Sequence, residues 1–343
     1  MNDILTKRTY FFIFLSIFLF GVVFLMDIII LKIHPLLEEA PLINVKFIIR
    51  TIILLMSALI ALLPFLQFKA VNFNADSYFS RNVFNTIIIC SLIVSLGFTL
   101  MFILNPSGFS KMGLEGNFIE KFSALAFFVC ALFFGLLFLK IVKRAPFIYS
   151  IANLGFAFLF FLIGMEEVSW FQHTLELETP IAFSNNIQGE MNLHNFATPY
   201  FETAYYFGSF VFLIILTFIH NVFGVFKNSK FISTYVPSSL VFFVGSIFIS
   251  YNYDMWNVSF MQWSFIITLI ILLYYLFKNE SQYKFIALLC VFALLFSQSF
   301  FLLLGDRFVR LWDVTEYKEF FIPLAFMIYS VEILVRTKKD SFK

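Results

Sequence analysis

Ten long apolar stretches constrain this chain more strongly than any other feature of its sequence. About 20 apolar residues in helical form cross the hydrocarbon core of a bilayer, and a helix satisfies its backbone polar groups internally. Strands of a membrane barrel would alternate apolar and polar residues, and these stretches do not alternate. The sequence therefore predicts an all-α fold, a polytopic transmembrane helix bundle of about ten helices. The expected helices span residues 9–33, 45–68, 83–104, 122–142, 148–168, 204–226, 236–253, 258–277, 284–304 and 319–335.

The composition also favours a membrane environment. Of the 343 residues, 61% are hydrophobic and 13% are charged, whereas soluble domains have roughly 25% charged residues. Phe contributes 54 residues, which we interpret as lipid-facing and interhelical packing because Phe inserts favourably into bilayers. The net charge of +2 provides no strongly basic face for nucleic acid. We expect one transmembrane domain over residues 1–343, with membrane lipids as partners; the oligomeric state stays open.

Loop charges predict how the bundle is oriented. Lys and Arg accumulate in cytoplasmic loops, and here they concentrate near the N-terminus and in the even-numbered connections. These residues are Lys7, Arg8, Lys69, Arg81, Lys140, Lys143, Arg144, Lys227, Lys230, Lys278 and Lys284. Most odd-numbered connections are rich in acids, such as Glu38, Glu39 and Asp254. We therefore expect a multi-pass protein of the cell (inner) membrane with both termini in the cytoplasm.

The fifth connection, residues 166–203, is much longer than the others. Long ordered loops are usually functional, and the alternative is disorder. This segment contains too many aromatic and aliphatic residues for disorder. We expect it to fold back on the extracytoplasmic side as a re-entrant or interfacial loop.

The beginning of this connection has ionisable side chains at helical spacing. If the preceding helix continued, Glu166, Trp170 and His173 would recur at i, i+4 and i+7 and share one face. Glu167 would lie beside them at the edge of the hydrocarbon, where ionisable residues are costly and suggest function. Burial shifts the pKa values of such groups toward neutrality, which suits general acids and bases.

A second group follows closer to the next helix. Glu190 and His194 are four residues apart, which would place them on one face if the segment were helical. This spacing is weakly specific, and interfacial Glu and His residues are often only solvated or hydrogen-bonded. We take both groups together as the candidate catalytic residues. They are Glu166, Glu167, His173, Glu190 and His194.

The same side chains are also candidate ligands for a divalent metal. Carboxylates and imidazoles suit zinc, iron or manganese, so we expect such an ion as a candidate cofactor. The metal ligands would be Glu167, His173, Glu190 and His194.

Candidate substrate-binding residues come from two parts of the chain. Arg307 and Arg310 in the last outer connection can hold a phosphate or carboxylate through forked hydrogen bonds. Trp170, Gln188 and Asn195 in the long connection complete the set. Elsewhere, Asp27 and Arg50 occur at similar depths in the first two helices, and we expect them to form a structural ion pair.

The long connection also resembles a known group of sequences. Residues 166–172 read Glu-Glu-Val-Ser-Trp-Phe-Gln, and residues 186–195 read Asn-Ile-Gln-Gly-Glu-Met-Asn-Leu-His-Asn. This pattern is similar to E-E-[IV]-S-W-x-Q followed by N-x-Q-x-E-x-N-L-H-N in a group of uncharacterised bacterial multi-pass membrane proteins. Phe171 stands where that group has Gly. The resemblance emphasises the same residues and implies no particular reaction.

Three classes of function fit these observations. The preferred one is an enzyme whose outward-facing Glu/His site acts on a lipid or lipid-linked substrate, because the site lies at the membrane interface. A transporter or flippase is an alternative, although the helix centres are almost purely apolar and no repeat is visible. The other alternative is a non-catalytic membrane scaffold or sensor.

Overall fold

The fold is a bundle of membrane-spanning helices. The computed structural model describes residues 7–41, 43–66, 78–114, 116–184, 186, 189–278 and 283–339, and these ranges form helices without any strand. Nine helices in these ranges are long and apolar enough to cross a membrane. The protein is therefore an integral, multi-pass membrane protein with an all-α architecture, as the sequence predicts.

The bundle consists of thirteen α-helices in the described chain. They are α1 (Lys7–Met26), α2 (Val45–Leu66), α3 (Arg81–Leu104), α4 (Pro106–Met112), α5 (Phe118–Ile141), α6 (Phe147–Glu167), α7 (Thr198–Phe210), α8 (Thr217–Phe223), α9 (Lys230–Tyr235), α10 (Ser239–Gly245), α11 (Ser259–Phe277), α12 (Lys284–Leu303) and α13 (Lys318–Lys339). A π-helical segment, Val211–Leu216, joins α7 and α8 into one long crossing.

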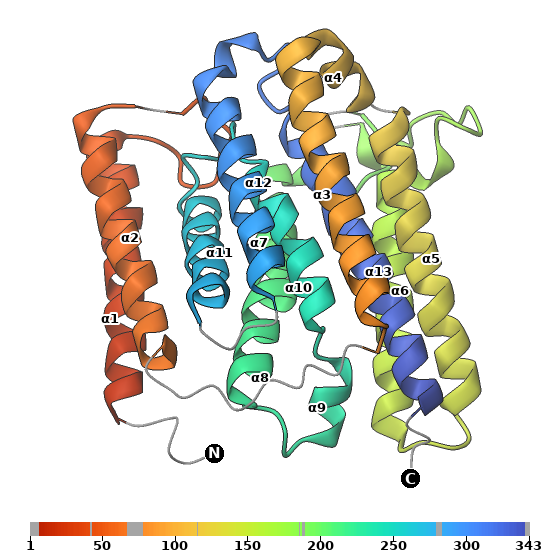
Figure 1. The fold of residues 1–343 in the computed structure, drawn as a ribbon. Helices are drawn as coiled ribbons and strands as arrows, with labels where there is room; N and C mark the ends of the chain where they lie inside the picture. The colour runs from red at the N-terminus through yellow and green to blue at the C-terminus, as the bar shows by residue number, and fades with distance from the viewer. Residues whose placement is uncertain are drawn as a thin grey trace.

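The arrangement of the helices places the long connections at one end. In Figure 1, α1 begins and α13 ends at the lower end, whereas α4 and the loop 168–197 lie at the upper end. The α1–α2 hairpin contacts the rest of the bundle mainly through α11, and α5, α6 and α13 pack together on the other side. The start of α1 and the end of α13 therefore lie on the same side of the bundle, and the cytoplasmic location of that side stays a prediction.

The seventh predicted crossing, residues 236–253, differs from the others. It is short, with α10 followed by a 3-10 helix, Ser246–Ser250. Every residue from 235 to 252 is buried, and α10 packs against α3, α8, α12 and α13. A segment enclosed by other helices does not need to cover the full hydrocarbon thickness, and irregular backbone is tolerated at such a depth. Burial therefore explains why this crossing is shorter than the sequence suggested.

A buried ion pair attaches the α1–α2 hairpin to α11. Arg50 Nε donates to Asp27 Oδ1 at 2.7 Å, and both side chains have no exposed surface. The Arg50 guanidinium also donates to the Asn257 carbonyl at 2.7 Å, to Ser259 Oγ at 2.8 Å and to Gln262 Oε1. The predicted pairing of Asp27 and Arg50 is thus confirmed, and its partners from α11 and the preceding turn compensate for the lost hydration.

Candidate functional site: a loop locked by histidines above a buried carboxylate cluster

The chain reverses sharply where α6 ends. Helix α6 stops at Glu167, and Ser169, Trp170 and Phe171 have φ values of +46°, +54° and +60°. Side chains with a Cβ rarely adopt this left-handed region, so three such residues in succession break the helix. The expectation that Glu166, Trp170 and His173 share one continued helical face is therefore wrong. Phe171 occupies a conformation that Gly adopts without strain.

Glu166 and His194 form the first of two carboxylate–histidine pairs. His194 Nδ1 lies 3.2 Å from Glu166 Oε2, which also accepts from the Leu193 and His194 backbone N–H groups at 2.7 and 3.2 Å. Trp170 Nε1 donates to the other carboxylate oxygen at 2.8 Å. Glu166 therefore fastens the end of the loop to the end of α6.

Glu190 and His173 form the second pair. His173 Nε2 is 2.8 Å from Glu190 Oε1, while Ser169 Oγ and Asn192 Nδ2 donate to Glu190 Oε2 at 2.8 and 3.0 Å. The segment around Glu190 is a turn, so the expected Glu190–His194 helical face is not formed. The reason is local, because Asn186 Oδ1 accepts from the Glu190 backbone N–H at 3.2 Å, which competes with helical hydrogen bonding. Each histidine instead pairs with the carboxylate of the opposite segment.

Amide and hydroxyl side chains complete the loop. Gln172 Oε1 accepts from the Met191 N–H at 2.7 Å, and its Nε2 donates to Thr179 Oγ1 at 2.9 Å. Thr179 Oγ1 in turn donates to the Gly189 carbonyl at 2.6 Å. Most of the polar residues in the two sequence patterns thus contact one another. Their main structural effect is to fix the path of the described residues between 168 and 197, which we name the histidine-locked loop.

Glu167 behaves differently from its neighbour Glu166. Its carboxyl faces the interior of the bundle, where it interacts electrostatically with Glu319 at the start of α13 and with Glu120 and Glu316. Glu167 therefore belongs to a second group of acids beneath the histidine-locked loop.

This second group is centred on Glu38, in the loop between α1 and α2. The Glu38 carboxyl hydrogen-bonds with Asp254 and with Glu202 on α7. The Glu39 N–H donates to the Asp254 carbonyl at 3.0 Å, and Asn257 Nδ2 donates to the Ala40 carbonyl at 2.9 Å. These two contacts hold Glu39 and Ala40 against the turn that precedes α11.

Lys318 and Glu319, at the start of α13, complete the group. Asp254 and Lys318 are 0% and 1% exposed, and both attract each other electrostatically. Lys318 Nζ lies 4.7 Å from the centre of the Tyr206 ring, and the Tyr206 hydroxyl donates to Glu319 Oε1 at 2.8 Å. We name Glu38, Glu202, Asp254 and Glu319, together with Lys318, the carboxylate cluster.

Burial and mutual repulsion keep protons on this cluster. Desolvation, reinforced by the charges of Asp254 and Glu202, raises the pKa of Glu38 to about 10. Desolvation also raises the pKa of Asp254, but Lys318 and the Thr315 hydroxyl, which donates at 2.6 Å, favour its charged form. A proton shared between the two carboxyls therefore resides mainly on Glu38 at neutral pH.

The predicted arginines lie elsewhere at the same end of the bundle. Arg307 Nη1 donates to the Ile103 carbonyl at 2.7 Å. Arg310 donates to Asp313 Oδ1 at 2.8 Å and to the Gly113 carbonyl at 3.2 Å. The arginines thus connect the last loop to α3 and α4. Of the other predicted binding residues, Trp170 contacts Glu166, Asn195 is buried at 2% exposure, and Gln188 lies outside the described residues.

The predicted metal ligands do not converge on one point. Glu167 faces the bundle, while His173 and His194 belong to two separate pairs. Within the described residues, no group of three or more His, Cys, Asp or Glu side chains is arranged to hold a metal ion. The divalent metal stays a prediction, and the chemistry below is derived from the side chains alone.

Sequence reasoning missed the centre of the site. Glu38, Glu202 and Lys318 come from three different parts of the chain, and no spacing relates them. One usable signal was present, because Glu202 is the single Asp, Glu, Lys or Arg residue of the crossing Thr198–Phe223. Comparisons with family models, with curated proteins and with solved structures find no match to this chain.

Proposed function

We propose that this protein is a membrane enzyme that performs acid–base chemistry on a lipid or lipid-linked substrate, with the carboxylate cluster as its catalytic centre. The observation that supports this most directly is the Glu38 carboxyl, hydrogen-bonded to both Asp254 and Glu202 beside Lys318. Ionisable groups near the hydrocarbon are costly, and a function is the usual reason for keeping them. A purely structural role would be served better by apolar side chains.

The cluster has the groups that proton transfer requires. Glu38 holds a proton at neutral pH and can act as general acid, while Asp254, next to Lys318 and Thr315, is the better base. Two titratable groups whose environments separate their pKa values are typical of acid–base sites. Glu38, Glu202 and Glu319 also keep part of their surface accessible. A substrate group can therefore reach them, whereas Asp254 and Lys318 form the buried base of the site.

The position of the cluster favours an amphipathic substrate. It lies where membrane-spanning helices give way to loops, so a polar head group and an apolar chain are both accommodated there. The positive-inside pattern supports an extracytoplasmic location for this end. A topology reporter fused after Lys230 should accordingly score as cytoplasmic, since α9, which begins at Lys230, lies at the opposite end.

A transporter is the second candidate, and one observation favours it. The buried crossing of α10 and Ser246–Ser250 is unusually short and ends two residues before Asn252. Unusually short hydrophobic segments mark the binding sites of many transporters. Transport predicts movement of a solute or proton across proteoliposomes containing the purified protein, whereas the enzyme proposal predicts chemical conversion of a lipid.

A comparison of membrane lipids tests the enzyme proposal. The wild type, Glu38→Gln and Glu176→Gln are expressed in a bacterial host, and total lipid extracts are compared with the empty-vector strain by mass spectrometry. Glu176 is an exposed glutamate in the histidine-locked loop, so it provides a matched control. We expect a changed lipid species with the wild type and with Glu176→Gln, and a reduction of about 10²–10⁴-fold in that change with Glu38→Gln. An unchanged lipid profile with folded wild-type protein, or full activity of Glu38→Gln, would refute the proposal.

A further inference from the structure

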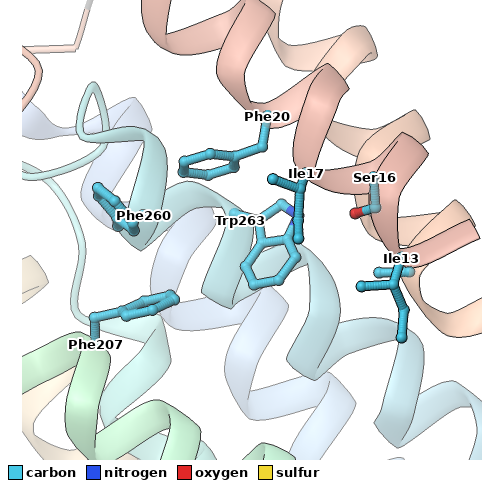
Figure 2. Close-up of a pocket in the computed structure, with 8 residues that line it drawn as sticks. Ile13, Ser16, Ile17, Phe20, Phe207, Phe260 and Trp263 are labelled. Atoms are coloured by element: carbon cyan, nitrogen blue, oxygen red, sulfur yellow. The ribbon is translucent and has the colours of Figure 1, made fainter. Parts of the chain in front are cut away.

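An apolar groove lies between the α1–α2 hairpin and the rest of the bundle. It has a volume of about 300 Å³ and is lined by side chains from α1, α2, α7 and α11. The lining residues are Ile13, Ser16, Ile17, Phe20, Ala61, Phe207, Phe260 and Trp263. Figure 2 shows Phe20, Phe207, Phe260 and Trp263 surrounding one end, with Ile17 and Ile13 continuing along α1.

The chemistry of the groove suits a hydrocarbon chain. Two lining side chains have polar atoms. The Ser16 hydroxyl is already engaged, because it donates to the Ser57 carbonyl at 2.9 Å, while the indole N–H of Trp263 is buried without a hydrogen-bond acceptor among the described residues. All the lining residues belong to crossings that lie at membrane depth, where lipid is the surrounding medium. An apolar cavity of ~150 Å³ holds benzene, so one of twice that volume holds about twelve carbons. That is a large part of one acyl chain.

The aromatic end of the groove approaches the carboxylate cluster along two chain segments. On α7, Phe207 is five residues below Glu202, which corresponds to about 7.5 Å along the helix axis. On the other side, Phe260 is the second residue of α11 and comes six residues after Asp254. The rings of Phe20 and Phe207 each lie 5.0 Å from that of Phe260, so the three form a continuous wall at this end.

The geometry points to a binding site for one hydrocarbon chain of the lipid on which the carboxylate cluster acts. This inference rests on the proposed function, and it adds where the substrate is held. A chain in the groove would run along α1 toward Ile13 and Ala61, and its head group would emerge beside Glu202 and Glu38. Holding the chain fixes the head group next to the acid, which is how remote binding energy assists a reaction.

Photo-crosslinking tests the site without requiring activity. The purified protein is placed in phosphatidylcholine nanodiscs containing a phosphatidylglycerol with a diazirine near the end of one acyl chain, and labelled peptides are mapped by mass spectrometry. Ala61→Phe fills the groove from α2, and Ile17→Trp fills it from α1. Leu55→Phe, on the lipid-facing side of α2 and 40% exposed, is the control. Melting temperatures show whether each variant is folded. Because two variants fill the groove from different helices, the test remains possible if one of them does not fold.

We expect labelling of the α1 and α11 peptides to fall about tenfold in both filling variants and to stay unchanged in Leu55→Phe. Equal labelling in all four proteins would mean ordinary surrounding lipid and would overturn the inference. A filling variant that has lost the label but still converts lipid at the wild-type rate would also overturn the inference. The proposed function would remain intact in that case. Groove-dependent labelling without any lipid conversion by the wild type would instead refute the proposed function and retain the groove as a lipid site.

Discussion

Removing Arg50 should destabilise the bundle more than removing its whole ion pair. Arg50→Met leaves the Asp27 carboxylate buried with Ser259 as its remaining hydrogen-bond donor and deprives the Asn257 carbonyl of its donor. Breaking one side of a buried pair costs about 3–5 kcal/mol, whereas replacing both partners by apolar groups is often neutral. An unfolding entropy of about 2.1 cal/mol/K per residue gives about 0.7 kcal/mol/K for 343 residues. The melting temperature should therefore fall by about 4–7 °C in Arg50→Met.

The chain's own cysteines provide the assay. Cys130 and Cys290 are buried and become reactive toward a fluorogenic maleimide on unfolding, while Cys90 is exposed and is replaced by Ser in all proteins compared. The double variant Asp27→Leu/Arg50→Met should recover most of the melting temperature lost in Arg50→Met. A melting temperature for Arg50→Met equal to that of the parent would refute the argument. So would a double variant at least as unstable as Arg50→Met, because uncompensated charge would then not be the cause.

Three further predictions follow from the site. Phe171→Gly should melt at a higher temperature than Phe171→Ala, because both remove the ring and only Gly adopts the left-handed φ without strain. That conformation costs other residues about 1–2 kcal/mol. Equal melting temperatures of the two variants would contradict this prediction. The free energy of unfolding should decline as the pH rises from 4.5 toward 10, because folded Glu38 keeps a proton that the unfolded chain releases. The melting temperature should therefore change less with pH in Glu38→Gln than in the wild type. An unchanged slope would count against the raised pKa of Glu38. Glu190→Gln should increase proteolytic cleavage within the histidine-locked loop, because the Glu190 carboxylate accepts hydrogen bonds from His173 and two other donors there. Glu178→Gln, at an exposed position, is the control. Cleavage of Glu190→Gln no faster than that of Glu178→Gln would argue that these hydrogen bonds do not hold the loop.

The sequence was most informative where a physical requirement acts on a long continuous segment. The hydrocarbon core demands helices of about 20 apolar residues, so nine crossings were recognisable from composition and length. The α10 crossing is shorter than this requirement because surrounding helices, not lipid, cover it. Spacing arguments failed at the end of α6, where three left-handed residues replaced the expected helical turn. Periodicity assumes a regular backbone, and Ser169 to Phe171 depart from it.

The candidate site was predictable in part for the same reason. The histidine-locked loop is a local structure, so its interacting residues lie within about 30 positions and formed a visible pattern. The carboxylate cluster joins the α1–α2 loop, α7, the turn before α11 and the start of α13, and only the packing of helices brings these together. One member of the sequence pattern, Glu167, directly precedes the loop and interacts electrostatically with Glu319 of the cluster. It shows that the loop pattern and the distant acids are contiguous in space.

The arrangement of charges also bears on why the cluster has one lysine among several acids. With all four carboxyls ionised, Lys318 would leave the cluster with a formal charge of −3, which is costly in a partly dehydrated site. Complete neutralisation by arginines or lysines would remove that cost but would also eliminate a proton held near neutral pH. Partial neutralisation lets Lys318 favour the charged form of Asp254, while Asp254 and Glu202 favour the protonated form of Glu38. Under the proposed function, Glu38 is then the acid and Asp254 the base within hydrogen-bonding distance of it, which is the condition that proton transfer to a bound substrate requires.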